Sequence, residues 1–197
     1  MSEQQATSVN IKTNVKKLLP TLLIIMGLFS FLTASSAEPS KMKTINYHGG
    51  VVVFRIPDSW KEEYSEVDGG TFYENKPDSG TFRLKVMLVH KENEITTDST
   101  IQILNSLKQL KGKGESESNG NALAHYEEST EDQGHKIKIF YWIIVNPIPP
   151  SHARIATFSY TILQSQEKDP QIAQQLQMLD QEIRSASFSK ETGVEPK

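Results

Sequence analysis

Histidine, serine, threonine and the acidic residues are the side chains with which this chain could carry out chemistry, because the sequence contains no cysteine. Nucleophilic catalysis needs a serine, threonine or cysteine that lies beside a general base. The sequence has no Gly-x-Ser-x-Gly elbow and no glycine-rich phosphate loop, which are local patterns that place such groups. We therefore predict no catalytic residue, no cofactor and no enzymatic activity, and we keep a hydrolase with an unrecognised site only as a third alternative.

The five histidines are the residues best suited to a metal ion. None of them has the His-x-x-x-His or His-Glu-x-x-His spacing of a zinc site. His90 and His125 lie on candidate strands, and neighbouring strands would bring them together beside Glu92 or Glu127. Solvated or singly hydrogen-bonded histidines are far more common, so we predict no metal site. The five residues are His48, His90, His125, His135 and His152.

Acidic residues gather in two segments, one after Trp60 and one around a predicted hairpin. Calcium sites need several oxygen ligands in a defined order. Neither segment has that order, and nothing fixes a separation between two carboxylates for acid–base hydrolysis. Solvated surface charge is the interpretation that we favour, and the sequence leaves cation binding open. The first group is Glu62, Glu63, Glu66 and Asp68, and the second is Glu127, Glu128, Glu131 and Asp132.

The segment 146–152, with the sequence NPIPPSH, is the candidate for binding a protein partner. Its three prolines, with an isoleucine between them, predict a stiff and partly apolar projection. Prolines reduce the entropy that a loop loses on binding. The alternative is a simple connection between two strands. The candidate partner-binding residues are Pro147, Ile148, Pro149 and Pro150.

The elements that must position these residues are mainly strands, which the sequence predicts where apolar and polar residues alternate between turn residues. In the segment 81–90, Phe82 and Leu84 share one face while Arg83 and Lys85 share the other. The prolines after Asn146 are expected to end the longest strand, because proline cannot donate to the ladder. The predicted strands are 43–47, 51–56, 71–74, 81–90, 123–130, 135–146 and 154–163.

Two amphipathic helices are predicted among these strands. The first has Thr97 or Asp98 as its cap and runs to the glycines of segment 112–114. The second starts with Asp169 as its cap and Pro170 as its first residue. The order of strands, a helix, long antiparallel strands and a second helix predicts an α+β fold, in which the helices pack on a single antiparallel sheet.

Residues 1–37 have the pattern of a signal peptide, with Lys16 and Lys17 before the apolar segment 18–32 and small residues up to Ala37. An uncleaved N-terminal anchor is the alternative, since the apolar segment is at the short end of what spans a bilayer. Either reading predicts an exported protein, periplasmic or secreted, and contact with the membrane only if the segment is uncleaved. The remainder predicts one domain over 38–189 and a flexible tail over 190–197.

The net charge of the full chain is −3, and the leader carries three of its lysines and only one acidic residue. The exported part is therefore more acidic than the full chain. A phosphate backbone repels such a domain, so we predict no nucleic acid as partner.

A short motif resembles a known superfamily. Phe54, Ile56, Pro57 and Trp60 form the pattern Phe-x-Ile-Pro-x-x-Trp. It follows a short strand and precedes a polar stretch, an aromatic strand and a long strand. This order resembles the PsbP-like superfamily, which includes the extrinsic protein of photosystem II, a eukaryotic Ran-binding import factor and many secreted bacterial proteins of unassigned role. The resemblance implies an α-β-α sandwich with a central antiparallel sheet, and a binding or assembly role rather than catalysis.

The same motif predicts where its tryptophan lies. Pro57 ends the strand before it, so Trp60 is expected to fold back over the sheet and be buried there, rather than to stack on a ligand.

The leading hypothesis is therefore an exported, non-enzymatic accessory or assembly protein that binds a protein partner through a PsbP-like domain. The alternative is a module of the periplasm that binds a small ligand or a metal ion in a pocket between the sheet and a helix.

Overall fold

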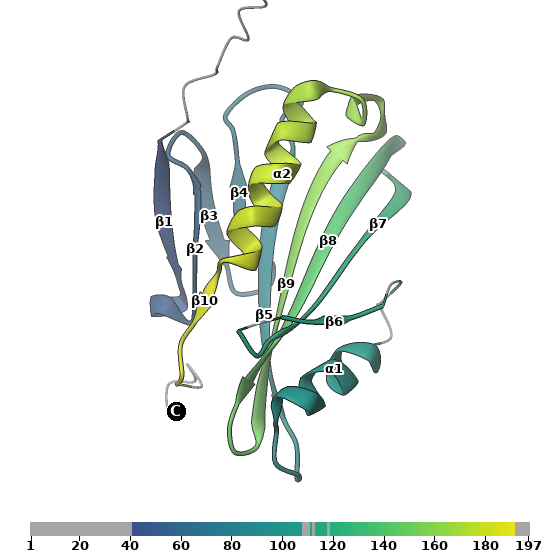
Figure 1. Ribbon diagram of the computed structural model, residues 1–197. Helices are drawn as coiled ribbons and strands as arrows, with labels where there is room; N and C mark the ends of the chain where they lie inside the picture. Colours follow the sequence, from purple (N-terminus) through teal and green to yellow (C-terminus); the bar gives the residue numbers. More distant parts are fainter. Residues whose placement is uncertain (1–40, 108–110, 112, 118, 192–197) are drawn as a thin grey trace, which may run out of the picture. The chain divides into compact units, whose positions relative to one another are not determined.

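The computed structural model describes residues 41–107, 111, 113–117 and 119–191, so the predicted leader lies outside the described residues. In this part of the chain, seven strands form an antiparallel sheet in the order β3-β4-β5-β9-β8-β7-β6. Figure 1 shows α2 lying across this sheet and α1 near one of its ends. The strands are β3 (Lys61–Ser65), β4 (Gly69–Tyr73), β5 (Thr81–His90), β6 (Glu115–Ser116), β7 (Ala122–Asp132), β8 (His135–Ile148) and β9 (His152–Leu163).

A second, smaller sheet shares the side of the large sheet that α2 covers. It consists of β1 (Met42–Tyr47), β2 (Val52–Pro57) and β10 (Ser187–Phe188), with β2 in the middle. A short 3₁₀ turn, η1 (His48–Gly50), joins β1 to β2. The prediction of a single sheet is therefore wrong. The β1–β2 hairpin does not pair with the large sheet but with β10, which follows α2. The α-β-α order of layers is confirmed.

The first helix, α1 (Thr97–Asn105), is shorter than predicted. Its cap is Thr96, whose hydroxyl accepts from the backbone N–H of Ser99 at 3.4 Å, while the Ser99 hydroxyl accepts from the N–H of Thr96 at 2.8 Å. This reciprocal pair satisfies two N–H groups and fixes the start one residue earlier than expected. Ser106 caps the C-terminus of the helix, and its hydroxyl donates to the carbonyl of Ile103 in the last turn, so Leu107 lies beyond the helix.

The second helix, α2 (Pro170–Arg184), starts as predicted. The Asp169 carboxylate accepts from the N–H of Gln171 at 2.8 Å, and the first helical position is the proline. A 3₁₀ turn, η2 (Gln164–Gln166), joins this helix to β9. The buried apolar stripe of α2, which includes Leu179 and Ile183, faces the large sheet and the small one.

Aromatic rings fill the core between α2, the small sheet and the large sheet. The ring of Phe54 in β2 makes edge-to-face contacts with Phe72 at 5.5 Å, Phe82 at 5.9 Å and Phe158 at 5.5 Å. Such contacts add about 0.5–1.5 kcal/mol each to the stabilisation from burial. The central position of Phe54 explains how the small sheet is held against the large one.

Trp60 closes this core, and its predicted burial is confirmed. The side chain is 3% exposed and stacks on Tyr160, with ring centroids 6.3 Å apart and 14° between the planes. The N–H of Trp60 donates to the carbonyl of Pro57 at 3.0 Å, which forms the turn that brings the indole back.

A separate, smaller core lies under α1 on the other face of the large sheet. Ile103 and Leu104 of the helix pack there against Ile143 and Ile155. The two cores are separated by the sheet itself, because neighbouring residues of each strand point to opposite faces.

Strand β8 does not end at its first proline, as predicted, but continues to Ile148. Pro147 lies opposite Ala153, and the pairing with β9 persists to the end of the strand. The last residue of β8 that faces β7 is Val145. Beyond it β8 is an edge strand, where a missing N–H is tolerated.

The acidic segment after Trp60 was expected to be a loop, but residues 61–65 form β3. All five side chains are exposed, so the segment has no apolar alternation from which a strand could be recognised. Charged residues on such an edge strand discourage pairing with other chains.

The contacts of the domain extend beyond the predicted boundary at residue 189. The guanidinium of Arg154 donates to the carbonyl oxygens of Ser189 at 3.0 Å and Glu191 at 2.5 Å. Residues 192–197 of the predicted tail lie outside the described residues. No helix in the part of the chain that the structure describes is long and apolar enough to cross a bilayer.

Candidate functional site

The face of the large sheet opposite α2 is covered by α1 at one end only. There α1 packs on β7 and β8 and helps to bury Ala124, Ile143 and Val145. We name the rest of this face the open face, because its side chains are half-buried or exposed. The open face comprises Thr71, Tyr73, Thr81, Arg83, Lys85, Tyr126, Ile139, Tyr141, Thr157, Ser159 and Thr161.

The register of the strands aligns these side chains in rows across the sheet. Residues directly opposite each other in antiparallel strands have Cβ atoms about 4.5–5.5 Å apart, so each row is a continuous strip of contacts. The central row consists of Thr71, Arg83, Ser159, Tyr141 and Tyr126. The next row consists of Tyr73, Thr81, Thr161 and Ile139.

Two tyrosines form the aromatic part of the open face. The rings of Tyr126 and Tyr141 stack across β7 and β8, with centroids 5.0 Å apart and 24° between the planes. Burial and, to a lesser degree, the Glu128 carboxylate raise the pKa of Tyr141, while Lys111 and Arg83 act in the opposite direction. Burial also raises the pKa of Tyr126, so both phenols are neutral at physiological pH.

The charges of the open face are arranged with a cation at the centre. Arg83 is exposed and pairs with no carboxylate of the described residues. The Lys85 side chain donates to the carbonyl of Val67 at 3.1 Å. The carboxylates near the margins are engaged, since Glu63 accepts from the Tyr73 hydroxyl and Glu128 binds Lys111 at 2.5 Å. The open face therefore attracts negative charge on a domain whose sequence is acidic as a whole.

The four predicted partner-binding residues lie at the tip of the β8–β9 hairpin, at the end of the sheet that α1 covers. Pro149 and Pro150 are exposed, but Ile148 is 5% exposed and does not project from the loop as expected. The alternation of β8 turns its side chain into the protein. Two hydrogen bonds from the segment 91–95, to the carbonyls of Pro150 and Ser151, hold the tip in place. Nothing tests whether this tip binds a partner, and that role stays a prediction.

The histidines are arranged differently from the prediction. His90 and His125 are not neighbours, because β9 and β8 lie between their strands. His90 instead lies directly opposite His152, with ring centroids 4.8 Å apart. His125 stacks on Trp142, with centroids 4.8 Å apart.

The acidic segments form ion pairs and hydrogen bonds with neighbouring groups. The Tyr64 hydroxyl, at 2.6 Å, and then the Lys43 ammonium hold the pKa of Glu62 below its usual range. In the second segment, Glu127 binds Lys138 at 3.1 Å. Within the described part of the chain, no three histidine or acidic side chains converge as a metal site would require.

Two cavities bear on the small-ligand alternative. One of about 260 Å³ lies between α2, the turn after β2 and the connection from β4 to β5, rather than between the large sheet and a helix as the alternative expected, and Trp60 and Gln175 are among its lining residues. Another, of about 440 Å³, lies between β1 and the β3–β4 hairpin, and its lining includes His48, Tyr64 and Glu66. Small-molecule sites typically have volumes of about 300–1,000 Å³.

Sequence reasoning missed the open face as a site, although one signal for it was present. The alternation in 81–90 already placed Arg83 and Lys85 on the exposed side of their strand. The strand order was required to add Tyr141 and Ser159 from β8 and β9 to the same row.

The comparisons with known proteins bear on the fold. No family model and no curated protein matches the chain. A crystal structure from Bacteroides thetaiotaomicron is 17% identical with a TM-score of 0.51, and the match covers 76% of this chain and 49% of that one. LpqN of Mycobacterium tuberculosis, a protein involved in cell envelope biogenesis, is 12% identical with a TM-score of 0.50, over 78% of this chain and 87% of its own.

A third match is the cyanobacterial PsbP of Synechocystis, at 9% identity and a TM-score of 0.39, over 80% of this chain and 98% of that one. The chain spans about half the length of the Bacteroides protein. The expected α+β fold, a sandwich with a central antiparallel sheet, is confirmed, and identities this low show the fold alone.

Proposed function

From this α-β-α sandwich as premise, we propose that the chain is an exported, non-enzymatic accessory protein whose PsbP-like domain binds an acidic segment of a protein partner on its open face. The observation that carries the proposal is the cross-strand row of Arg83, Ser159, Tyr141 and Tyr126 on a part of the sheet that α1 leaves uncovered. Tyrosine and arginine are the residues most enriched among those that dominate binding energy at protein interfaces.

The composition of the open face supports a protein rather than a small molecule as the partner. Stacked tyrosines and Ile139 supply apolar contact area, and the threonine and serine hydroxyls around them supply hydrogen bonds. The rows extend over five neighbouring strands, whereas a small-molecule site is concave and encloses its ligand. The uncompensated charge of Arg83 and the charge of Lys85 favour a partner segment that carries carboxylates.

Export is supported by the N-terminal sequence, in which two lysines, an apolar segment and small residues follow one another up to Ala37. The involvement of LpqN in cell envelope biogenesis fits a domain of this fold outside the cytoplasm. Contact with the membrane is part of the proposal only if the leader is not removed.

Photo-crosslinking in the native host tests the docking surface. A photoreactive phenylalanine analogue replaces Ser159 at the centre of the open face, and in a matched variant it replaces the exposed Gln181 on the outer side of α2. We expect a discrete adduct with one protein from position 159 and none from position 181. The substitution Arg83→Glu in the same chain is expected to remove the adduct, since it places a carboxylate opposite the partner's own.

Three outcomes would overturn the proposal: no adduct from position 159, equal adducts from both positions, or an adduct that Arg83→Glu leaves unchanged. An analogue at Pro150 tests the hairpin tip in the same experiment. A discrete adduct from position 150 alone would move the docking surface to the prolines and reject the open face.

A further inference from the structure

His90 and His152 form a pair that the function proposed above does not use. They are the last residue of β5 and the first residue of β9, and they lie directly opposite each other in the register. Their ring centroids are 4.8 Å apart with 48° between the planes. His90 is exposed and His152 half-buried, so the pair is accessible from solvent.

The spacing of the two rings suits two ligands of one metal ion. An imidazole nitrogen lies about 2.0–2.1 Å from zinc, which places the ring centroid about 3.2 Å from the metal. Two rings in adjacent coordination positions then have centroids about 4.5 Å apart for a right angle at the metal and about 5.2 Å apart for a tetrahedral angle. The observed 4.8 Å lies between these limits. We propose that His90 and His152 bind one divalent transition-metal ion, such as Zn²⁺, Ni²⁺ or Cu²⁺.

The surroundings define what kind of site this is. The Nδ1 atom of His152 lies 3.3 Å from the Ser151 hydroxyl, which occupies this nitrogen and leaves Nε2 for a metal. The described residues offer no third histidine or carboxylate in a group with these two. Water, or a side chain of a bound partner, completes the coordination sphere. Imidazole ligands select transition metals over Ca²⁺ and Mg²⁺, which prefer oxygen.

The remaining histidines are placed for other contacts. His125 stacks on Trp142, and His48 makes an edge contact with Tyr47 at 4.3 Å. His135 is exposed in the β7–β8 hairpin, at the opposite end of the sheet from His90 and His152. It therefore serves as a matched control for surface histidine.

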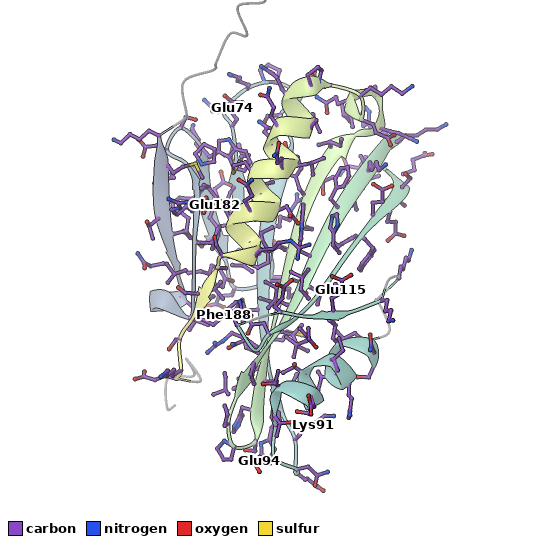
Figure 2. The ribbon with its side chains drawn as sticks, in the orientation of Figure 1. Glu74, Lys91, Glu94, Glu115, Glu182 and Phe188 are labelled. Carbon is purple, nitrogen blue, oxygen red and sulfur yellow. The ribbon has the colours of Figure 1, made fainter. Side chains whose placement is uncertain are left out.

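The position of the pair gives the metal a structural consequence. Figure 2 shows Lys91 and Glu94, which follow β5 directly, at the end of the sheet where the β8–β9 hairpin lies. The backbone N–H of Lys91 donates to the carbonyl of Ser151 at 2.8 Å, beside the two histidines. A metal ion bound by one histidine from each strand would link the last residue of β5 to the first residue of β9 beside this hairpin.

Zinc titration of the full chain, free of any histidine tag, tests the site. We expect one Zn²⁺ per chain by calorimetry, with binding weakened about tenfold or more by His90→Gln and by His152→Gln, since loss of an outer-shell partner alone costs 10–100-fold. The control His135→Gln is expected to bind as the unmodified chain does. Circular dichroism and the Tm of each metal-free variant establish that it is folded.

A second measurement identifies the ligands directly. The electron paramagnetic resonance spectrum of bound Cu²⁺ is expected to show coupling to two nitrogens in the unmodified chain and to one in either single variant. The proposal is overturned if the double variant His90→Gln, His152→Gln binds Zn²⁺ as tightly as the unmodified chain, or if His135→Gln weakens binding equally.

Discussion

The two faces of the large sheet are built from the same strands in the same register, yet they carry different side chains for different purposes. The face toward α2 presents Phe72, Phe82, Phe158 and Trp142, all buried. The face away from it presents Tyr141, together with threonines, a serine and an arginine, of which none is fully buried. Because a strand alternates its side chains between faces, each residue serves one face only.

This difference separates stability from binding. The α2 face meets a helix, a second sheet and Trp60, so its residues stabilise the fold through burial at about 25 cal/mol per Å² of apolar surface. The open face contributes little of this stabilisation, and its composition is therefore free to suit a partner. Substitutions on the two faces are expected to have different effects. On the α2 face they lower the stability of the fold, and on the open face they lower the affinity for the partner.

The largest expected effect is that of Phe54→Ala, in the small sheet that packs against the α2 face. Phe54 touches three other phenylalanine rings and joins the two sheets, so the substitution leaves a cavity that its rigid neighbours cannot fill. We expect the free energy of unfolding to fall by about 3–5 kcal/mol, measured by urea denaturation. A fall of less than about 1 kcal/mol would show that the small sheet does not depend on this core.

Arg154 is the exception on the α2 face and gives the next largest effect. It is 1% exposed, burial lowers its pKa, and its Nε is buried without a hydrogen-bond partner among the described residues. Its guanidinium donates to Asn146 at 3.0 Å and to the carbonyls of Ser189 and Glu191. We expect Arg154→Ala to cost about 2–4 kcal/mol, since it removes hydrogen bonds from a charged donor and creates a cavity.

The matched variant Arg154→Met separates these two contributions. Methionine fills much of the same space, and it removes the cost of burying a charge that has no carboxylate partner in the described part of the chain. It is expected to be clearly more stable than the alanine variant in the same denaturation assay. If the two variants are equally unstable, the hydrogen bonds to the C-terminal segment carry the whole effect.

How far the sequence predicted these faces depends on the element. The pattern Phe-x-Ile-Pro-x-x-Trp, the alternation of β5 and the Asp169–Pro170 cap were local signals, and each gave the correct element. Strand β3 was missed because all its side chains are exposed. Pro147 was wrongly expected to end β8, because a proline is tolerated there only since the pairing of β8 with β7 stops at Val145.

The sites needed more than local signals. The row that joins Arg83 to Tyr141, and the pairing of His90 with His152, depend on which strands are neighbours. Local patterns do not contain that information, which is why the prediction paired His90 with His125 instead. The burial of Arg154 was missed for the same reason, since its partners come from residues 8 to 37 positions away in the sequence.

A smaller effect is expected from Tyr141→Ala on the open face. The ring is half-buried and stacks on Tyr126. Loss of the ring contact should lower the free energy of unfolding by about 0.5–1.5 kcal/mol, in addition to a small loss from the apolar area that it buries. The same variant should lose the crosslink from position 159, which Phe54→Ala should retain while it remains folded. A loss of stability as large as that of Phe54→Ala would mean that the open face belongs to the core.

The smallest effect concerns His125, which lies at the margin of the α2 face on Trp142. Burial lowers its pKa below the ordinary value of about 6.5, and this effect outweighs the opposing attraction of Asp180. The folded chain therefore binds fewer protons than the unfolded chain. The stability linked to His125 is complete above the unfolded pKa and is lost as the pH falls through it toward the lower folded pKa.

We expect the unmodified chain to lose more stability between pH 7.5 and pH 5.5 than His125→Gln, by less than about 1 kcal/mol because the ring is partly solvated. His135→Gln, at the exposed start of β8, is the matched control. Equal losses in the unmodified chain and in His125→Gln would show that the contact with Trp142 does not favour the neutral ring.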